Sequence, residues 1–108
     1  MKSEVIFGDE KVKSAFENLA NFKDKEVQEQ LNKAFCNLRE NAYCGTQIPK
    51  HLIPKEYFRR FGNLTNLWKY NLPNAWRLIY TIKNEQIEVI SVVLEWMDHK
   101  EYERRFKY

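Results

Sequence analysis

The chain has 108 residues, of which 44% are hydrophobic and 15% aromatic, so we expect one domain over residues 1–108 with enough apolar side chains for a core. No apolar run approaches the roughly 18 residues of a membrane helix, and the first residues turn acidic too early for a secretion signal. These features predict a cytoplasmic protein. Two cysteines, Cys36 and Cys44, are too few for a disulfide framework. With no His or third Cys close by, they predict no metal site, and no cofactor is expected.

The net charge of +3 is unevenly distributed along the chain. Residues 1–44 carry seven Lys or Arg against eight Asp or Glu, residues 45–70 five against one, and residues 71–108 six against six. A local excess of positive charge attracts polyanions such as RNA. We therefore expect RNA contacts from cations of the basic segment and one near the C-terminus: Lys50, Lys55, Arg59, Arg60 and Lys100.

The first half of the chain predicts a short strand followed by two helices. Residues 5–7 form a brief apolar run that is typical of a strand. Apolar side chains then recur at helical spacing over residues 9–21, where Asp9 can cap the first turn, and again over residues 24–42. The short link at residues 22–23 predicts an antiparallel helical hairpin.

The second half changes character. Pro54 predicts the start of a short helix that Gly62 ends. The apolar period then becomes two, and short turns at residues 73–75 and 83–86 predict antiparallel pairing. Three strands are expected, over residues 67–72, 76–82 and 87–96. The fold class is therefore α+β, a short N-terminal strand, a helical hairpin and a three-stranded antiparallel meander, with the helices packed on one face of the sheet and the other face open to solvent or a partner.

This order of elements, together with two stretches of sequence, resembles the RelE/ParE family of toxins from bacterial and archaeal toxin–antitoxin pairs. The first stretch is residues 67–82, with its centre Arg77-Leu78-Ile79-Tyr80, and the second is the tail Asp98-His99-Lys100-Glu101-Tyr102. The resemblance implies a RelE-like fold and the toxin of a type II toxin–antitoxin system. It implies a cognate antitoxin whose extended segment wraps the toxin, and a ribosome-dependent endoribonuclease that cuts mRNA and inhibits translation.

Metal-independent RNA cleavage needs groups that remove the 2′-hydroxyl proton, stabilise the phosphorane oxygens and protonate the leaving 5′-oxygen. Alternation along residues 76–82 places Arg77 on the face opposite Trp76 and Leu78, where its guanidinium can bind a phosphate with two parallel hydrogen bonds. The resemblance implies a further cation at Lys69. His99 suits proton transfer, and Tyr102 could serve as acid, base or stacking surface. The candidate catalytic residues are Arg77, His99, Tyr102 and Lys69.

Each candidate also has a structural interpretation. Arg77 can lie on a solvated sheet face or pair with Glu88 or Glu95, and Lys69 can be plain surface. Tyr102 can pack the C-terminus together with Phe106.

The sequence also departs from the family pattern. Asn71 stands where ribosome-dependent members often have a second Lys, and the acidic Glu95 and Asp98 stand near the place of a further Arg. Two alternatives therefore stay open. One is a ParE-like toxin that binds DNA gyrase without nuclease activity, and the other is a non-toxic family member that acts only as a binding module.

Overall fold

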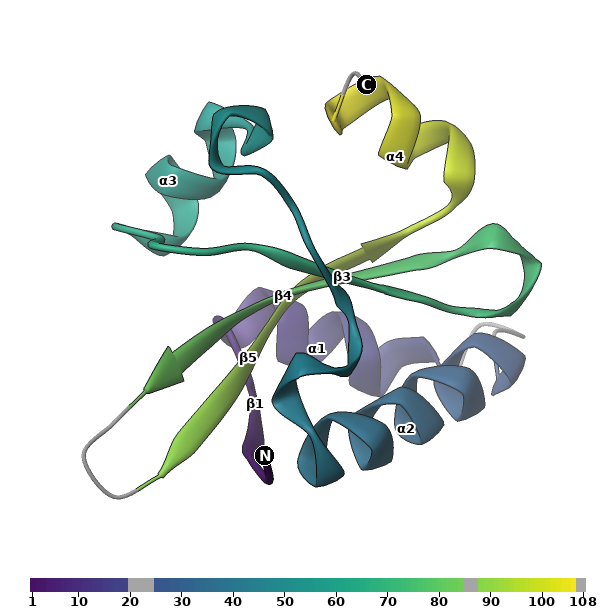
Figure 1. Cartoon of the computed structure of the whole chain (residues 1–108). Coiled ribbons are helices and arrows are strands. Elements are labelled where there is room, and N and C mark those ends of the chain that lie inside the picture. The colour runs from purple at the N-terminus through teal and green to yellow at the C-terminus, as the bar shows by residue number, and fades with distance from the viewer. Residues whose placement is uncertain (20–24, 85–87, 107–108) are drawn as a thin grey trace.

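A five-stranded sheet separates two layers of helices (Figure 1). The structure is a computed structural model that describes residues 1–19, 25–84 and 88–106. The longer elements, in chain order, are β1 (Glu4–Phe7), α1 (Glu10–Asn18), α2 (Lys25–Glu40), β2 (Thr46–Gln47), α3 (Lys55–Phe61), β3 (Trp68–Asn71), β4 (Arg77–Asn84), β5 (Val89–Met97) and α4 (His99–Phe106). Within these ranges, no helix combines the length and apolarity that a membrane crossing requires.

The sheet is mixed, with the strand order β1-β5-β4-β3-β2. The predicted meander is present as β3, β4 and β5, which pair antiparallel, whereas β1 pairs parallel to β5. The α+β class is confirmed. The two-residue β2, which pairs with β3, was not predicted, since Thr46 and Gln47 are too few to show a period. The predicted turn at residues 83–86 lies partly in β4 and partly outside the described residues.

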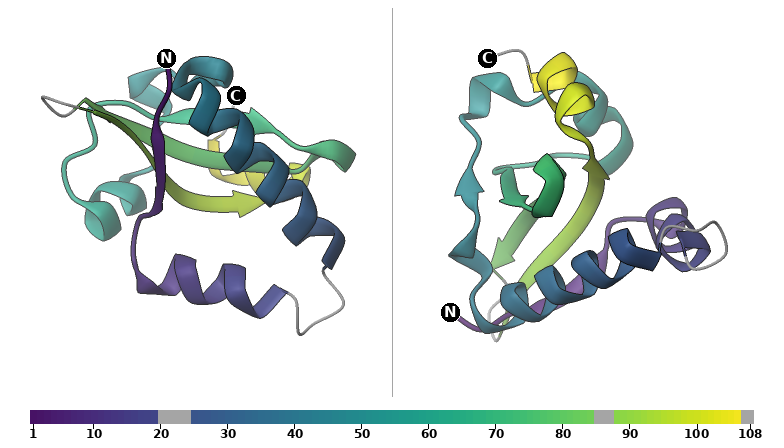
Figure 2. Two further views of the ribbon diagram at one scale, coloured as in Figure 1. Left: turned by 90° about the horizontal axis from the view of Figure 1, so that it is seen from below. Right: turned by 90° about the vertical axis from the view of Figure 1, so that its right-hand side faces the viewer.

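The first helical layer packs as predicted. The apolar stripes of α1 and α2 cover one face of the sheet, and the axes of the two helices lie at an open angle to one another (Figure 2). The buried residues of this core are Val12, Leu31, Ala34, Phe35, Leu38, Ala42, Leu72, Leu78, Tyr80, Ile82 and Val93. α1 ends at Asn18 and α2 at Glu40, both short of the predicted ends, and the predicted link at 22–23 lies outside the described residues.

The prediction that the opposite face is open is wrong. α3, α4 and the segment before β3 cover it and form a second core. Its buried residues are Ile48, Ile53, Tyr57, Leu64, Leu67, Ile79, Val92, Leu94, Met97, Tyr102 and Phe106. The reason lies in β5, which is apolar on both sides and therefore needs cover on both faces.

Both predicted limits of α3 are confirmed. α3 begins directly after Pro54 and ends before Gly62, whose φ of 84° is a conformation that side-chain-bearing residues rarely adopt.

Gly45 lets the segment just before β2 approach β3 closely, because a Cβ there would lie 2.5 Å from the carbonyl oxygen of Lys69. The close approach of this loop to the backbone of Lys69 therefore requires a glycine at position 45.

The turn between β3 and β4 stores backbone strain. Asn74 and Ala75 have φ values of 60° and 63°, and the N–H of Leu72 donates to the carbonyl of Trp76 across the turn. Asn tolerates this left-handed region, whereas Ala is disfavoured there because its Cβ approaches the carbonyl oxygen.

We expect Ala75→Gly to raise the free energy of unfolding by about 0.5–1 kcal/mol, since relief of the strained φ outweighs the entropy that glycine adds to the unfolded chain. Ala15→Gly, an exposed site inside α1, is the matched control and is expected to lower it by about 1 kcal/mol. Urea unfolding of both variants is the measurement. A loss of stability in Ala75→Gly contradicts the strain.

Asp9 ties the two helical layers together at the sheet edge. Its Oδ1 accepts from the N–H of Val12 at 2.9 Å, which is the predicted cap of α1. The guanidinium of Arg60 on α3 binds the same carboxylate through Nε at 2.9 Å and Nη2 at 3.2 Å. The hydrogen bond from Arg60 lowers the pKa of Asp9 below its ordinary value of 3.8.

Asp9→Asn keeps a capping oxygen but loses the ion pair. Because the folded-state pKa of Asp9 is lowered, its contribution is present above pH 3.8 and is lost as the pH falls through the folded-state pKa. We expect the variant to be less stable by about 0.5 kcal/mol at pH 7, since both side chains are partly solvated. The difference is expected to shrink as the pH falls below 3.8 and through the folded-state pKa. Urea unfolding at neutral pH and through the acidic range tests this, and a difference that does not change with pH contradicts it.

Candidate functional site

Lys69 from β3 and Arg77 from β4 meet at a single aromatic ring on α4. The Nζ of Lys69 lies 5.1 Å from the centroid of the Tyr102 ring, and the Cζ of Arg77 lies 5.6 Å from it. Phe106 stacks on the same ring with centroids 4.7 Å apart. The sheet and α4 thus bring together three of the four residues that the sequence predicted.

Arg77 lies on the predicted face of β4. The register pairs it with Asn71 and Met97, and its guanidinium extends toward α4 and not toward the core of α1 and α2. Its Nη1 donates to the carbonyl of the adjacent Trp76 at 3.2 Å. Its Nε is buried and, within the described ranges, has no hydrogen-bond partner.

A half-buried guanidinium without a carboxylate is costly, because it loses hydration that only an opposite charge or strong acceptor replaces. Of the other interpretations of Arg77, the ion pair with Glu95 is not formed, since Glu95 is bound to Tyr57 and Arg105. The ring of Tyr102 supplies part of the compensation as a cation–π contact. An anion bound to the guanidinium would supply the rest.

Tyr102 itself is only 2% exposed. Its ring packs against Phe106, so the interpretation that these residues pack the C-terminus describes their geometry. A nucleobase has no access to a ring that is covered in this way. Tyr102 is therefore a buried ring that makes cation–π contacts with Lys69 and Arg77.

His99 begins α4 and is exposed. Its Nε2 lies 2.7 Å from the Oε1 of Glu103, one turn further along the helix, and its side chain is 49% exposed. The predicted helical turn in the tail is present, and it extends to Phe106. His99 therefore lies at the surface, one turn before Tyr102, and contacts Glu103.

The acidic Glu95 has a role that the sequence analysis missed. Its Oε2 accepts from the hydroxyl of Tyr57 at 2.6 Å, and its Oε1 accepts from Nη1 of Arg105 at 2.6 Å. Tyr57 belongs to α3 and Arg105 to α4, so one carboxylate on β5 joins both helices of the second layer. Burial raises the pKa of the Tyr57 phenol above its ordinary value, and the charge of Glu95 adds to this. The hydroxyl therefore stays a donor.

Arg105 extends this network along α4. Its Nε donates to Glu101 at 2.7 Å, and Arg104 binds the same carboxylate. The hydrogen bonds of Arg104 and Arg105 hold the pKa of Glu101 at about 2. The negative charge of Glu95 is thus compensated by the ion pair with Arg105. The signal in the sequence was a carboxylate at the end of an apolar run, which requires a partner when the strand is covered.

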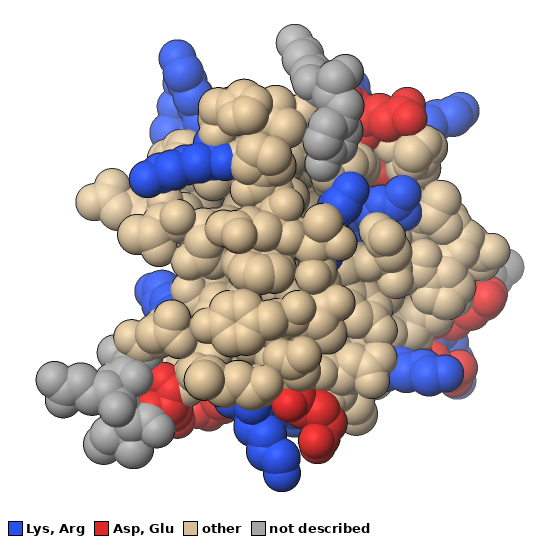
Figure 3. Space-filling model, viewed as in Figure 1, with Lys and Arg blue, Asp and Glu red and all other residues tan. Residues whose placement is uncertain are grey.

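The predicted RNA-contacting residues are spread over three elements. Lys50 belongs to the short 3-10 helix η3 (Lys50–Leu52), Lys55, Arg59 and Arg60 belong to α3, and Lys100 belongs to α4. All are exposed, and Arg60 is engaged by Asp9. In the view of Figure 3 the described Lys and Arg side chains form small separate groups around a largely uncharged face. Charge on this face is therefore local and not a continuous basic surface.

No metal centre is evident in the part of the chain that the structure describes, since no group of three His, Cys, Asp or Glu residues converges there. Lys69, Arg77 and His99 are the polar side chains on which candidate chemistry can be built. Comparisons of the chain with protein-family models, with curated proteins and with solved structures each found no significant match. The resemblance to RelE/ParE toxins stays a prediction.

We expect Glu95→Gln to lower the free energy of unfolding by about 1–3 kcal/mol, because it removes the charge that the Nη1 of Arg105 and the hydroxyl of Tyr57 both contact in a partly buried place. Amide exchange in α4 is expected to speed up, since this contact holds the helix to the sheet. Glu103→Gln removes an exposed pair with His99 on the same helix and is expected to change stability by less than about 0.5 kcal/mol. Equal effects of the two substitutions would exclude a role of Glu95 in docking α4.

Proposed function

We propose that this protein is the toxin of a type II toxin–antitoxin pair and that it binds and cleaves RNA at the site formed by Lys69, Arg77 and His99. The observation that carries the proposal is the half-buried Arg77, whose Nε lacks a partner among the described residues while a second cation shares the same ring. Adjacent cations attract an anion that both can contact, and a phosphodiester has the oxygens to bind a guanidinium in bidentate fashion.

The reaction that fits these residues is transesterification. The 2′-oxygen of the RNA attacks the adjacent phosphorus, the bond to the 5′-oxygen breaks, and the products are a 2′,3′-cyclic phosphate and a free 5′-hydroxyl. Lys69 and Arg77 stabilise the negative phosphorane oxygens. His99 takes the proton of the 2′-hydroxyl or returns one to the leaving oxygen, in the pH range in which imidazole titrates.

Two further features support an RNA-directed toxin. The Glu95 carboxylate, which would repel a phosphate, is paired with Arg105 and accepts a hydrogen bond from Tyr57. The element order and the stretch 67–82 resemble toxins whose members include mRNA endoribonucleases acting in the ribosome. A cognate antitoxin, the ribosome and mRNA are the partners that this proposal implies.

The test is induced expression in a bacterial host, with sequencing of RNA 5′-ends and growth curves. We expect cleavage within translated codons for the wild type and a loss of about 10²–10³-fold for Arg77→Ala, because one phosphorane-stabilising donor is removed. Arg77→Lys is expected to restore the reaction only in part, since Lys lacks the planar fork.

Arg39→Ala is the matched control, since Arg39 is an exposed residue of α2 on the other helical layer. It is expected to cleave like the wild type, and thermal unfolding verifies that each variant is folded. Growth arrest that persists in Arg77→Ala with intact RNA and rising DNA-damage markers would instead identify a gyrase-directed, ParE-like toxin. If the wild type causes neither growth arrest nor RNA cleavage, the toxin proposal is wrong and the binding module is the alternative that is left.

A further inference from the structure

A cavity of about 450 Å³ lies between α2 and the end of β3, where the chain turns toward β4. We call it the α2–β3 cavity. Its volume falls within the roughly 300–1,000 Å³ that small-molecule pockets occupy. Gln30, Lys33 and Ala34 of α2 line one side, and residues 70–73 line the other. The cavity is thus formed by a helix of the first layer and by the β3–β4 connection.

The sequence of α2 explains why space is left at this place. The buried stripe of the helix continues through Leu31, Ala34 and Leu38. The side chain of Ala34 ends at Cβ, so it does not fill the space that a leucine at the same position would occupy. Leu72, which is also buried, faces the cavity from the strand side. The base of the cavity is therefore apolar.

The polar groups around this base are hydrogen-bond donors. Lys33 is exposed and forms no ion pair with any residue that the structure describes, Glu29 one turn before it included. The hydroxyl of Tyr70 accepts from Nδ2 of Asn37 at 2.6 Å, and no described residue accepts its own proton. The side-chain amide of Asn71 can donate as well. Since no Asp or Glu lines the cavity, an anion is favoured there.

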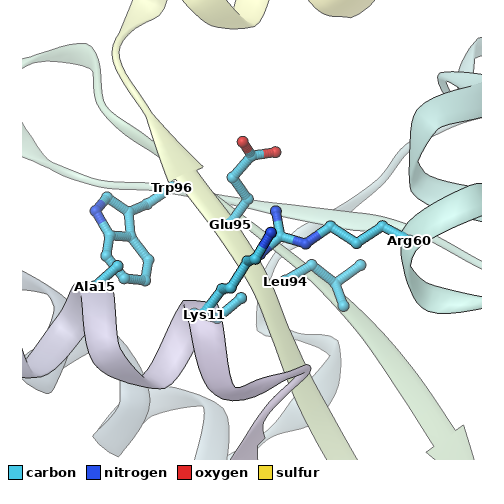
Figure 4. A pocket seen from close by; sticks show the side chains of 7 residues that line it. Lys11, Ala15, Arg60, Leu94, Glu95 and Trp96 are labelled. Atoms are coloured by element: carbon cyan, nitrogen blue, oxygen red, sulfur yellow. The ribbon is translucent and has the colours of Figure 1, made fainter.

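The cavity between α1 and α3 differs in charge and size. Lys11 and Arg60 extend toward one another in front of β5, and the carboxylate of Glu95 points away from both (Figure 4). Arg60 is already paired with Asp9, however, and Glu95 is one of the lining residues. The volume of about 240 Å³ is also below the roughly 300 Å³ at which small-molecule pockets begin. A small anion is therefore better accommodated in the α2–β3 cavity.

We propose that the α2–β3 cavity binds a small organic anion whose phosphate or carboxylate group contacts Lys33 and the hydroxyl of Tyr70. The apolar part of the ligand lies on Ala34 and Leu72. Hydrogen bonds from these donors to an ionised group are stronger than bonds to a neutral one. Tyr70 follows Lys69 on β3, so its side chain lies on the opposite face of the sheet and packs against the first core. The inference does not rest on the proposed RNA chemistry.

The experiment titrates the purified full chain with three probes that share a phenyl ring: phenyl phosphate, benzoate and the neutral benzamide. Amide NMR spectra report where each probe binds and how tightly. We expect both anions to shift the amides of residues 30–34 and 70–73 in a saturable manner. Benzamide is expected to bind at least about fivefold more weakly, because it carries no charge. The tighter of the two anions identifies the ligand class as a phosphate ester or a carboxylate.

Lys33→Gln and Tyr70→Phe each remove one donor and are expected to weaken binding of the anions about three- to tenfold. Lys25→Gln is the matched control, because it makes the same charge change on α2 at an exposed position outside the cavity. It is expected to bind within about twofold of the wild type. Thermal unfolding verifies that the variants are folded.

Four outcomes overturn the proposal. They are an absence of saturable binding by either anion, equal affinities for benzamide and benzoate, amide shifts that fall at other residues, and wild-type affinity in both Lys33→Gln and Tyr70→Phe.

Discussion

The structure depends on the burial of β5 on both of its faces. A strand that is apolar on both sides must be covered on both sides, since exposing either face leaves a large apolar surface in water. α1 and α2 cover one side, and α3, α4 and the segment before β3 cover the other. The second layer is thus a requirement of the strand itself, and it determines which polar side chains of the sheet meet α4.

The cover over β5 also makes partners necessary for Glu95. It lies at the end of β5 under the second layer, where an isolated carboxylate would lose much of its hydration. The hydroxyl of Tyr57 and the guanidinium of Arg105 satisfy it and connect α3 and α4 to the same strand. α4 in turn holds the ring of Tyr102 against Lys69 and Arg77. The geometry of the candidate site therefore depends on an interaction that lies outside it.

Arg77 lies in a different environment from the arginines that form ion pairs. Arg77 is half-buried, with an Nε that the described residues leave unpaired, whereas Arg60, Arg104 and Arg105 each contact a carboxylate. Buried charges are normally paired because the cost of desolvation is otherwise not recovered. An arginine that departs from this rule beside a second cation is a place where an anion gains binding energy. This is the physical basis on which the proposed site stands.

The sequence by itself determined the α+β class, the start of α1 at Asp9, the limits of α3 between Pro54 and Gly62, and the face of β4 on which Arg77 lies. These follow from local periodicity, capping and backbone preferences, which act within a few residues. Tertiary structure alone decided that the second face is covered, that Tyr102 is buried beneath two cations, and that Glu95 is neutralised by Arg105. Those contacts join residues of separate elements, and no local pattern encodes which of several cations reaches a given carboxylate or ring.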